Sequence, residues 1–189
     1  MMKAPPSRER KTEKKELTDP STPPERRAIA LCWVIHLVGD IHQPLHATSL
    51  FSKNYPTGDK GGNSFWVKGP YGNTGLHSLW DNMLGVSRNP CAIDKQLAEL
   101  QKDPKYGREA MKEQVAVTDP KAWAKESYGL AVEIVYQNAH LEGASKELLH
   151  EDPKSSANVP PLPVGYMDKA VQLADRRVML AGHRLADVL

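Results

Sequence analysis

Cysteine is scarce in this sequence, and long apolar runs and an excess of either charge are missing. The 189 residues include two cysteines, Cys32 and Cys91, which form neither a CxxC pair nor any other metal-binding spacing. Either a single disulfide or two buried free thiols would account for them. The cysteines therefore indicate no metal site and leave the redox compartment open.

The longest apolar stretch covers residues 28–35, far too short to span a bilayer. The formal net charge of +2 is too small to argue for a nucleic-acid or membrane partner. With 40% hydrophobic and 25% charged residues, the composition is that of a soluble globular protein with one core. We expect no membrane partner, and nothing in the sequence indicates an obligate protein partner.

Basic residues crowd the first fifteen positions among proline, serine, threonine and glutamate. Such a segment buries too little apolar surface to order itself, so we expect a disordered basic leader over residues 1–22. A weak electrostatic contact with nucleic acid is the alternative. No apolar segment follows before Ala28, so the start does not resemble a secretory signal.

The first helix is expected from about Pro23 to Asp40, because Ser21 to Glu25 resembles a capping box with proline at the first helical position. Its residues from 28 to 38 are apolar on every side, which indicates an enclosed, central helix. Pro44 ends or redirects it.

A long loop rich in glycine, asparagine and proline is expected over residues 47–75, with one β-like run at 64–67 that could form a small hairpin. Long loops of this kind are commonly functional. Further helices are predicted over residues 76–84, 93–101, 108–117 (weaker), 118–139 and 166–188. In the last, apolar residues at alternating spacings of four and three predict one packing stripe: Met167, Val171, Ala174, Val178, Ala181, Leu185 and Val188.

Three histidines and two aspartates at unusual spacings carry the chemistry. His36 and Asp40 lie four apart on the first helix, His77 and Asp81 repeat that spacing, and His46 follows the turn at Pro44. Burying such groups without partners would cost several kcal/mol. Nitrogen and oxygen ligands from two elements suit a catalytic zinc with one position open for water. The alternative is a buried polar network.

The remaining histidines have simpler interpretations. His42 points off the helical face of His36 and Asp40, and we expect it to support the site or the fold rather than bind metal. His140, His150 and His183 are isolated and are expected to be surface or packing residues.

The segments HLVGDIHQPLH, GDKGGN and LHSLWD resemble the signature segments of the single-strand-specific zinc nucleases, which include fungal S-one and P-one type enzymes and plant bifunctional nucleases. This family lies within the zinc-dependent phospholipase C superfamily. WAKESYGLAVEIVY and AGHRLADVL are similar to its closing helices, so the resemblance covers residues 23–189. It implies a mainly α fold holding three zinc ions, and hydrolysis of single-stranded DNA or RNA to 5′-phosphorylated products, with removal of 3′-phosphates from nucleotides in many members.

The resemblance also implies residue roles. By position, His46, His77 and Asp81 match the ligands of one zinc, His36 matches a ligand of a second, and Asp40 matches the carboxylate that bridges the second zinc to a third. Asn63 falls where the family contacts a nucleobase. Independently of the family, the aromatic residues of the loop could stack an unpaired base or pack beneath the loop: Phe65, Trp66 and Tyr71.

One departure from the family is expected to matter. The family takes its remaining zinc ligands from an N-terminal half, whereas residues 1–27 contain no histidine and a single aspartate, Asp19. We therefore expect the C-terminal part of a nuclease with one fully supported zinc site. Family members are usually exported. The alternatives are a phosphomonoesterase or phospholipase of the same superfamily, and a catalytically defective metal-binding remnant.

Overall fold

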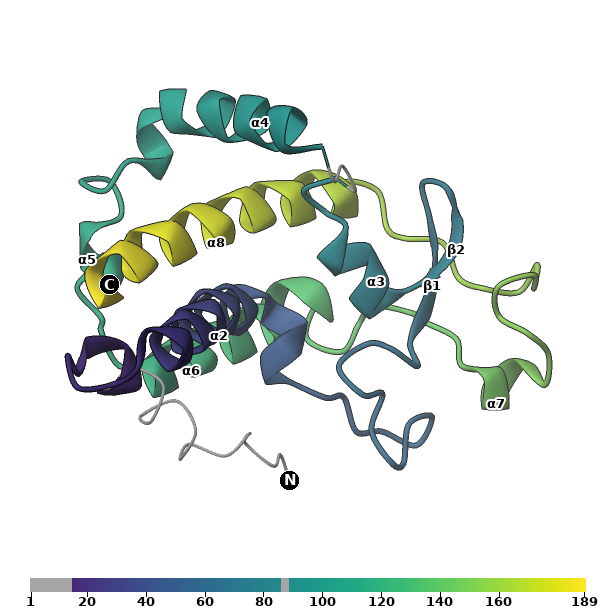
Figure 1. Ribbon diagram of the computed structural model, residues 1–189. Helices are drawn as coiled ribbons and strands as arrows, with labels where there is room; N and C mark the ends of the chain where they lie inside the picture. The colour runs from purple at the N-terminus through teal and green to yellow at the C-terminus, as the bar shows by residue number, and fades with distance from the viewer. Residues whose placement is uncertain (1–14, 86–88) are drawn as a thin grey trace.

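The computed structural model describes residues 15–85 and 89–189. Figure 1 shows a mainly helical molecule in which the C-terminal helix α8 runs the length of the helical part, with a hairpin of two strands at one end. The predicted mainly α fold is confirmed. Over the described residues the helices and strands are α2 (Pro24–His42), β1 (Trp66–Gly69), β2 (Gly72–Gly75), α3 (Leu76–Asp81), α4 (Pro90–Lys102), α5 (Lys112–Val115), α6 (Pro120–Leu130), α7 (Lys146–Leu149) and α8 (Tyr166–Val188).

Helix α2 begins one residue later than predicted. Pro24 occupies its first turn, where a missing N–H does no harm. The predicted capping box is wrong: extended Pro23 is the N-cap residue, no side chain caps the helix, and the backbone N–H of Thr22 donates to the Asp19 carbonyl. Proline at the N-cap shifts the register, so Glu25 no longer lies where a capping box requires it.

The expected leader lies mostly outside the described residues, which begin at position 15. Its described end is ordered, contrary to the expectation. Residues 15–18 form a helical turn. Leu17 packs against a small cluster with Val34 and Trp123, and Arg26 donates to both oxygens of Glu16 at 2.9 and 2.7 Å. An apolar contact and an ion pair therefore join this turn to α2.

The two faces of α2 differ, so the expectation of an enclosed helix is wrong for the described structure. One face, facing α6 and α8, buries residues four apart: Ala30, Val34, Val38 and His42. On the other side Ile29, Trp33 and Ile35 remain 47 to 49% exposed. Apolar residues on every side allow a helix to be buried all round, but the elements packed against it determine which side is buried.

Helix α8 has the predicted bounds, and five residues of the predicted stripe are buried or packed against the hydrophobic clusters: Met167, Ala174, Ala181, Leu185 and Val188. Val171 and Val178 are exposed instead, and two arginines, Arg177 and Arg184, are buried. Apolar periodicity missed the arginines because they are buried through hydrogen-bonded partners, which a hydrophobic pattern does not record.

Helix α6 is shorter than predicted. It passes into a π-helical turn at Ala131–Val135, and residues 137–139 all adopt positive φ angles of 50–66°. Left-handed residues cannot continue an α-helix, so the predicted end at Ala139 is wrong. The segment over 108–117 contains only the short α5, and the loop over 47–75 forms the hairpin β1–β2 with Trp66 opposite Gly75.

The largest hydrophobic cluster joins the loop, the hairpin and α3 to the end of α6 and the start of α8. Its members include Leu45, Phe65, Val67, Leu76, Trp80, Val135, Tyr136 and Tyr166. Since Leu76 and Trp80 flank His77 and Asp81 on α3, this packing fixes the helix that carries two of the five predicted zinc ligands. Cys32 and Cys91 are free and exposed, so neither the disulfide nor the buried thiols are observed. None of the described helices combines the length and apolarity needed to cross a membrane.

Candidate metal centre

The end of α2 is capped by side chains from two other helices. Helix C-termini leave carbonyl groups without backbone partners. The Ser127 hydroxyl of α6 donates to the Ile41 carbonyl at 2.5 Å, and Nε of Arg177 on α8 donates to the His42 carbonyl at 3.0 Å. These contacts fix where α2 ends. The chain then turns at Gln43 into a short 3₁₀ turn, Pro44–Ala47, which carries His46.

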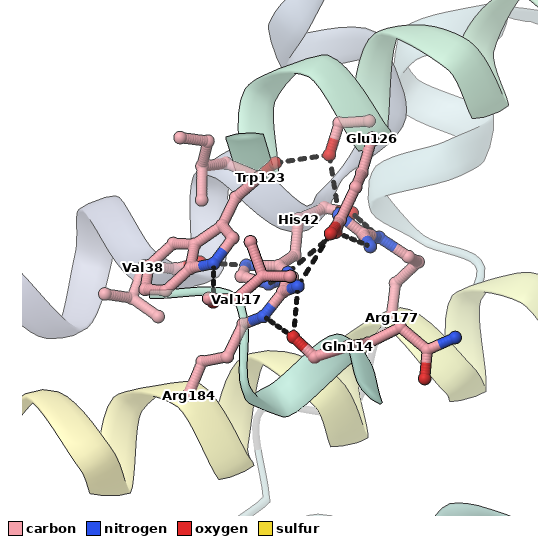
Figure 2. Close-up of polar contacts among 10 residues, drawn as sticks. Val38, His42, Gln114, Val117, Trp123, Glu126, Arg177 and Arg184 are labelled. Carbon is pink, nitrogen blue, oxygen red and sulfur yellow. Dashed lines mark hydrogen bonds and ion pairs between the residues drawn. The ribbon is translucent and has the colours of Figure 1, made fainter. Parts of the chain in front are cut away.

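His42 lies in a buried polar network that Figure 2 shows in full. Its Nδ1–H donates to the Val38 carbonyl at 2.7 Å, so its Nε2 accepts from Nη1 of Arg184 at 2.9 Å. Arg184 also donates to both carboxylate oxygens of Glu126 and to the Gln114 carbonyl. The acceptor nitrogen of the imidazole and both carboxylate oxygens of Glu126 therefore each face an arginine donor.

Charge and burial act together on the pKa values of this network. Burial, followed by the nearby Arg177, lowers the pKa of His42 to about 4. Burial alone would raise the pKa of Glu126, but the hydrogen bonds and charges of Arg184 and Arg177 outweigh it and lower that pKa. His42 is therefore a neutral structural residue, as the sequence indicated, and its ring packs against Trp123.

A second cluster includes His46, which follows His42 by four residues. The described residues bring together ligand atoms of His46, His77 and Asp81, all within 4.8 Å of one another. Asp81 Oδ1 lies 3.2 Å from His46 Nε2, and Asp81 Oδ2 lies 3.4 Å from His77 Nε2. The two rings stack with their planes 8° apart. In a tetrahedral zinc site with bonds of about 2.0–2.1 Å, neighbouring ligand atoms are about 3.3 Å apart, which is close to the two separations between the histidines and Asp81.

The hydrogen bonds of the two imidazoles decide where their free nitrogens point. His77 Nδ1 donates to the Gly61 carbonyl at 2.7 Å, and His46 Nδ1 lies 2.9 Å from Oδ1 of Asp40. A neutral imidazole has one N–H, which leaves Nε2 of each ring as an acceptor. Both acceptors face the Asp81 carboxylate, which is also an acceptor. Such an arrangement requires a shared cation or added protons between them.

The cluster opens into a surface depression of about 430 Å³. Among its lining residues are Asp40, His46, His77, Ser49, Lys60 and Gly61. A cation, Lys60, therefore lies in the same depression as the carboxylate and imidazole groups. The depression is large enough for a phosphate group and part of a nucleotide.

The sequence pattern of the family described as S1/P1 Nuclease matches residues 9–189. The chain belongs to this family. It is 33% identical over 122 residues to Endonuclease 4 of Arabidopsis thaliana, an alignment that covers 58% of this chain and 38% of that protein. It is 42% identical over 52 residues to Nuclease S1 of Aspergillus oryzae, covering 28% of this chain and 15% of the relative. The chain thus spans well under half the length of these relatives.

Three of the five predicted ligands form this group: His46, His77 and Asp81. Asp40 contacts the far nitrogen of the His46 ring, a position from which a carboxylate orients a metal-binding histidine. His36 is exposed on α2 with its ring edge-on to Trp33, and it is not part of the group. Roles for His36 and Asp40 as zinc ligands stay predictions.

The predicted substrate contacts fare differently in the structure. Phe65 is 2% exposed and stacks on Tyr55, so the expectation that it stacks a base is wrong and the alternative, packing beneath the loop, is observed. Trp66 is half-buried in β1, and Tyr71 is fully exposed at the hairpin turn. Asn63 is exposed, with its amide donating to the Lys60 carbonyl at 2.9 Å. Base contacts by Asn63 and Trp66 stay predictions.

Two partners of the cluster, Gln43 and Gly61, were not predicted from the sequence. Gln43 donates from Nε2 to Asp81 Oδ1 at 2.8 Å, and Gly61 supplies the carbonyl that orients His77. Gln43 lies inside the motif around His46, and Gly61 lies in the GDKGGN loop. Their positions inside the motif segments indicated that both residues could matter. Gln43, however, bonds a residue 38 positions away and Gly61 one 16 positions away, so no local spacing identifies these contacts. The other histidines agree with expectation: His140 and His150 are exposed, and His183 bonds the Tyr106 carbonyl.

Proposed function

We propose that the His46, His77 and Asp81 group binds zinc and forms part of an active site that hydrolyses phosphodiester bonds of single-stranded DNA or RNA to 5′-phosphorylated products. The observation that carries this proposal is the Asp81 carboxylate facing the Nε2 atoms of His46 and His77 at 3.2 and 3.4 Å. Each imidazole uses its other nitrogen elsewhere. One divalent cation satisfies all three acceptors at once, whereas the alternative requires a proton on each ring.

Zinc in such a site activates water and stabilises charge on phosphate oxygens, so hydrolysis requires no side-chain nucleophile. The residues of this chain hold the ligands in place and provide charge for the substrate. Gln43 holds Asp81, and Asp40 and Gly61 hold the two rings. Lys60 provides a positive charge at the edge of the depression, where it favours a phosphate backbone over a neutral substrate. Removal of 3′-phosphates from nucleotides is proposed as a second activity of the same site.

The family resemblance and the names of the relatives support a nuclease over the other activities of the superfamily. The open depression suits a substrate whose chain extends beyond the site, as a single strand does. Tyr71, fully exposed at the hairpin turn, and the half-buried Trp66 are the aromatic residues of the loop that we propose for contacts with bases of such a strand.

The test measures zinc binding by calorimetry on metal-free protein, together with turnover of a substrate panel: a single-stranded oligonucleotide, a 3′-nucleotide and phosphatidylcholine. We expect zinc to bind, and His46→Ala and Asp81→Ala each to weaken it at least 100-fold, because each removes one of three ligands. His140→Ala is the matched control, since it removes an exposed histidine whose ring bonds only the Gln137 carbonyl.

Zinc-dependent cleavage of the oligonucleotide that is lost in both variants supports the proposal. Preferential turnover of phosphatidylcholine would assign a phospholipase instead. Zinc binding without turnover of any substrate by this chain would identify a metal-binding remnant, and zinc binding that survives in both variants would refute the site itself.

A further inference from the structure

A buried aspartate lies in the loop that contacts His77. Asp59, in the GDKGGN segment, has no exposed surface. Its Oδ2 accepts from the Tyr136 hydroxyl at 2.5 Å, and its Oδ1 accepts from the Leu50 backbone N–H at 2.9 Å and the Ser49 hydroxyl at 3.2 Å. Taking a carboxylate out of water is expensive unless each oxygen finds donors. Asp59 is therefore held in one place by three converging donors.

Tyr136 connects this aspartate to the hydrophobic core. It caps the π-helical turn that follows α6, is 3% exposed, and packs edge-on against Phe65. Burial, and then the charge of Asp59, raise the pKa of Tyr136, so its hydroxyl remains a donor. Asp59 is thus held both by two donors of its own loop and by Tyr136, which follows α6 and lies outside the loop.

The backbone after Asp59 turns sharply towards His77. Lys60, Gly61 and Gly62 all have positive φ angles, at 57°, 64° and 85°. A side chain at Gly61 would place its Cβ 2.6 Å from the Leu45 carbonyl oxygen, so only glycine fits this close approach. The Gly61 carbonyl accepts from His77 Nδ1, and the Gly62 carbonyl accepts from the His77 backbone N–H at 3.2 Å.

We propose that Asp59 and Tyr136 are positioning residues of the metal centre: they anchor the loop so that the Gly61 carbonyl keeps His77 in the Nδ1–H tautomer, with Nε2 directed at Asp81. The ring could otherwise rotate or carry its proton on Nε2, where it would block a cation. Outer partners of this kind typically change metal affinity by about 10–100-fold. The part of this proposal that concerns zinc rests on the proposed function, while the tautomer of His77 does not.

Two loop variants and one control test it. Tyr136→Phe removes only the hydroxyl that holds Asp59, and Asp59→Asn keeps the shape of the side chain but removes its charge. Tyr106→Phe is the control, because Tyr106 is 4% exposed and its hydroxyl also contacts an aspartate, Asp175 at 3.5 Å, but it belongs to a separate cluster with Met111 and Met179.

The first readout is the long-range ¹⁵N–¹H spectrum of the histidines in metal-free protein at about pH 8, where ordinary imidazoles are neutral. The wild type and Tyr106→Phe are expected to show His77 as the Nδ1–H tautomer, and both loop variants to show a substantial Nε2–H population. The second readout is zinc affinity by calorimetry, which should fall about 10–100-fold in the loop variants and stay within twofold in the control.

A purely structural role would lower stability in the loop variants but leave the His77 tautomer and the zinc affinity unchanged, and that result would overturn the proposal. If the wild type binds no zinc, the proposed function fails, whereas the tautomer spectrum still decides whether Asp59 and Tyr136 orient His77. If one variant does not fold, the other gives the same readouts.

Discussion

Two histidines four residues apart, His42 and His46, lie in clusters of opposite character. His42 is buried, its Nδ1–H donates to the Val38 carbonyl, and its Nε2 accepts from Arg184, as Figure 2 shows. His46 lies at an open depression, where its Nε2 and that of His77 face the Asp81 carboxylate, acceptor against acceptor. A complete polar network stabilises a fold, whereas an incomplete one at the surface can be completed by a ligand.

Loss of one residue from the buried network around His42 should cause the largest loss of stability. Arg184→Met leaves the buried His42 and the half-buried Glu126 without their main partner, and we expect the free energy of unfolding to fall by about 3–5 kcal/mol. Denaturant titration of metal-free protein measures it. The matched control is Arg108→Met, whose exposed ion pair with Asp187 should contribute no more than about 1 kcal/mol. Equal losses in the two variants would contradict a special role for the buried network.

The same network predicts a dependence of stability on acid. The folded pKa of His42 is lowered to about 4, below its unfolded value near 6.5, so between these values the unfolded chain binds a proton that the folded chain does not. The free energy of unfolding should therefore be independent of His42 above about pH 7 and fall by roughly 3 kcal/mol as the pH decreases to about 4. The lowered pKa of Glu126 adds a loss in the same direction at still lower pH.

Urea titrations across this range, with a chelator present, measure the effect. The difference between wild type and His42→Gln isolates it, since glutamine can accept from Arg184 but does not titrate. If the free energy of unfolding changed with pH equally in both proteins, His42 would not be held neutral by the fold.

A substitution at the open cluster should change substrate binding more than it changes the free energy of unfolding. Lys60→Asn removes the positive charge at the depression while keeping a residue that tolerates positive φ. We expect the dissociation constant of a single-stranded oligonucleotide, measured by fluorescence anisotropy, to rise about three- to fivefold, with a shallower dependence on salt. Lys60→Arg retains the charge and should bind as the wild type does. Equal weakening in both variants would mean that Lys60 acts through the loop backbone and not through phosphate.

The sequence predicted the helices whose limits are set locally. Helix α8 has the expected bounds, and the spacing of His77 and Asp81 placed both on one face of α3. The sequence-based prediction was wrong where burial depends on groups far away along the chain. Arg177 and Arg184 are buried because Glu126 and the carbonyls of residues 42 and 114 receive them, and no apolar pattern indicates such partners. The outward face of α2 was misjudged for the same reason, since coverage depends on neighbours.

The candidate site shows the same division. The motif spacing identified His46, His77 and Asp81, which meet in space. The role of His36 at a second zinc stays a prediction. The roles of Gly61 and Asp59 depend on contacts with residues far along the chain, His77 and Tyr136, and on positive φ angles in the loop. Tertiary contacts of this kind become visible only in the fold.

A zinc titration followed by the ¹⁵N resonances of the histidines tests the central claim most directly, because it compares both clusters in one spectrum. We predict that zinc shifts Nε2 of His46 and His77 together at a stoichiometric ratio, while Nε2 of His42, already bonded to Arg184, does not move. Unchanged Nε2 resonances of His46 and His77 in the presence of zinc would contradict the assignment of this cluster as a metal centre.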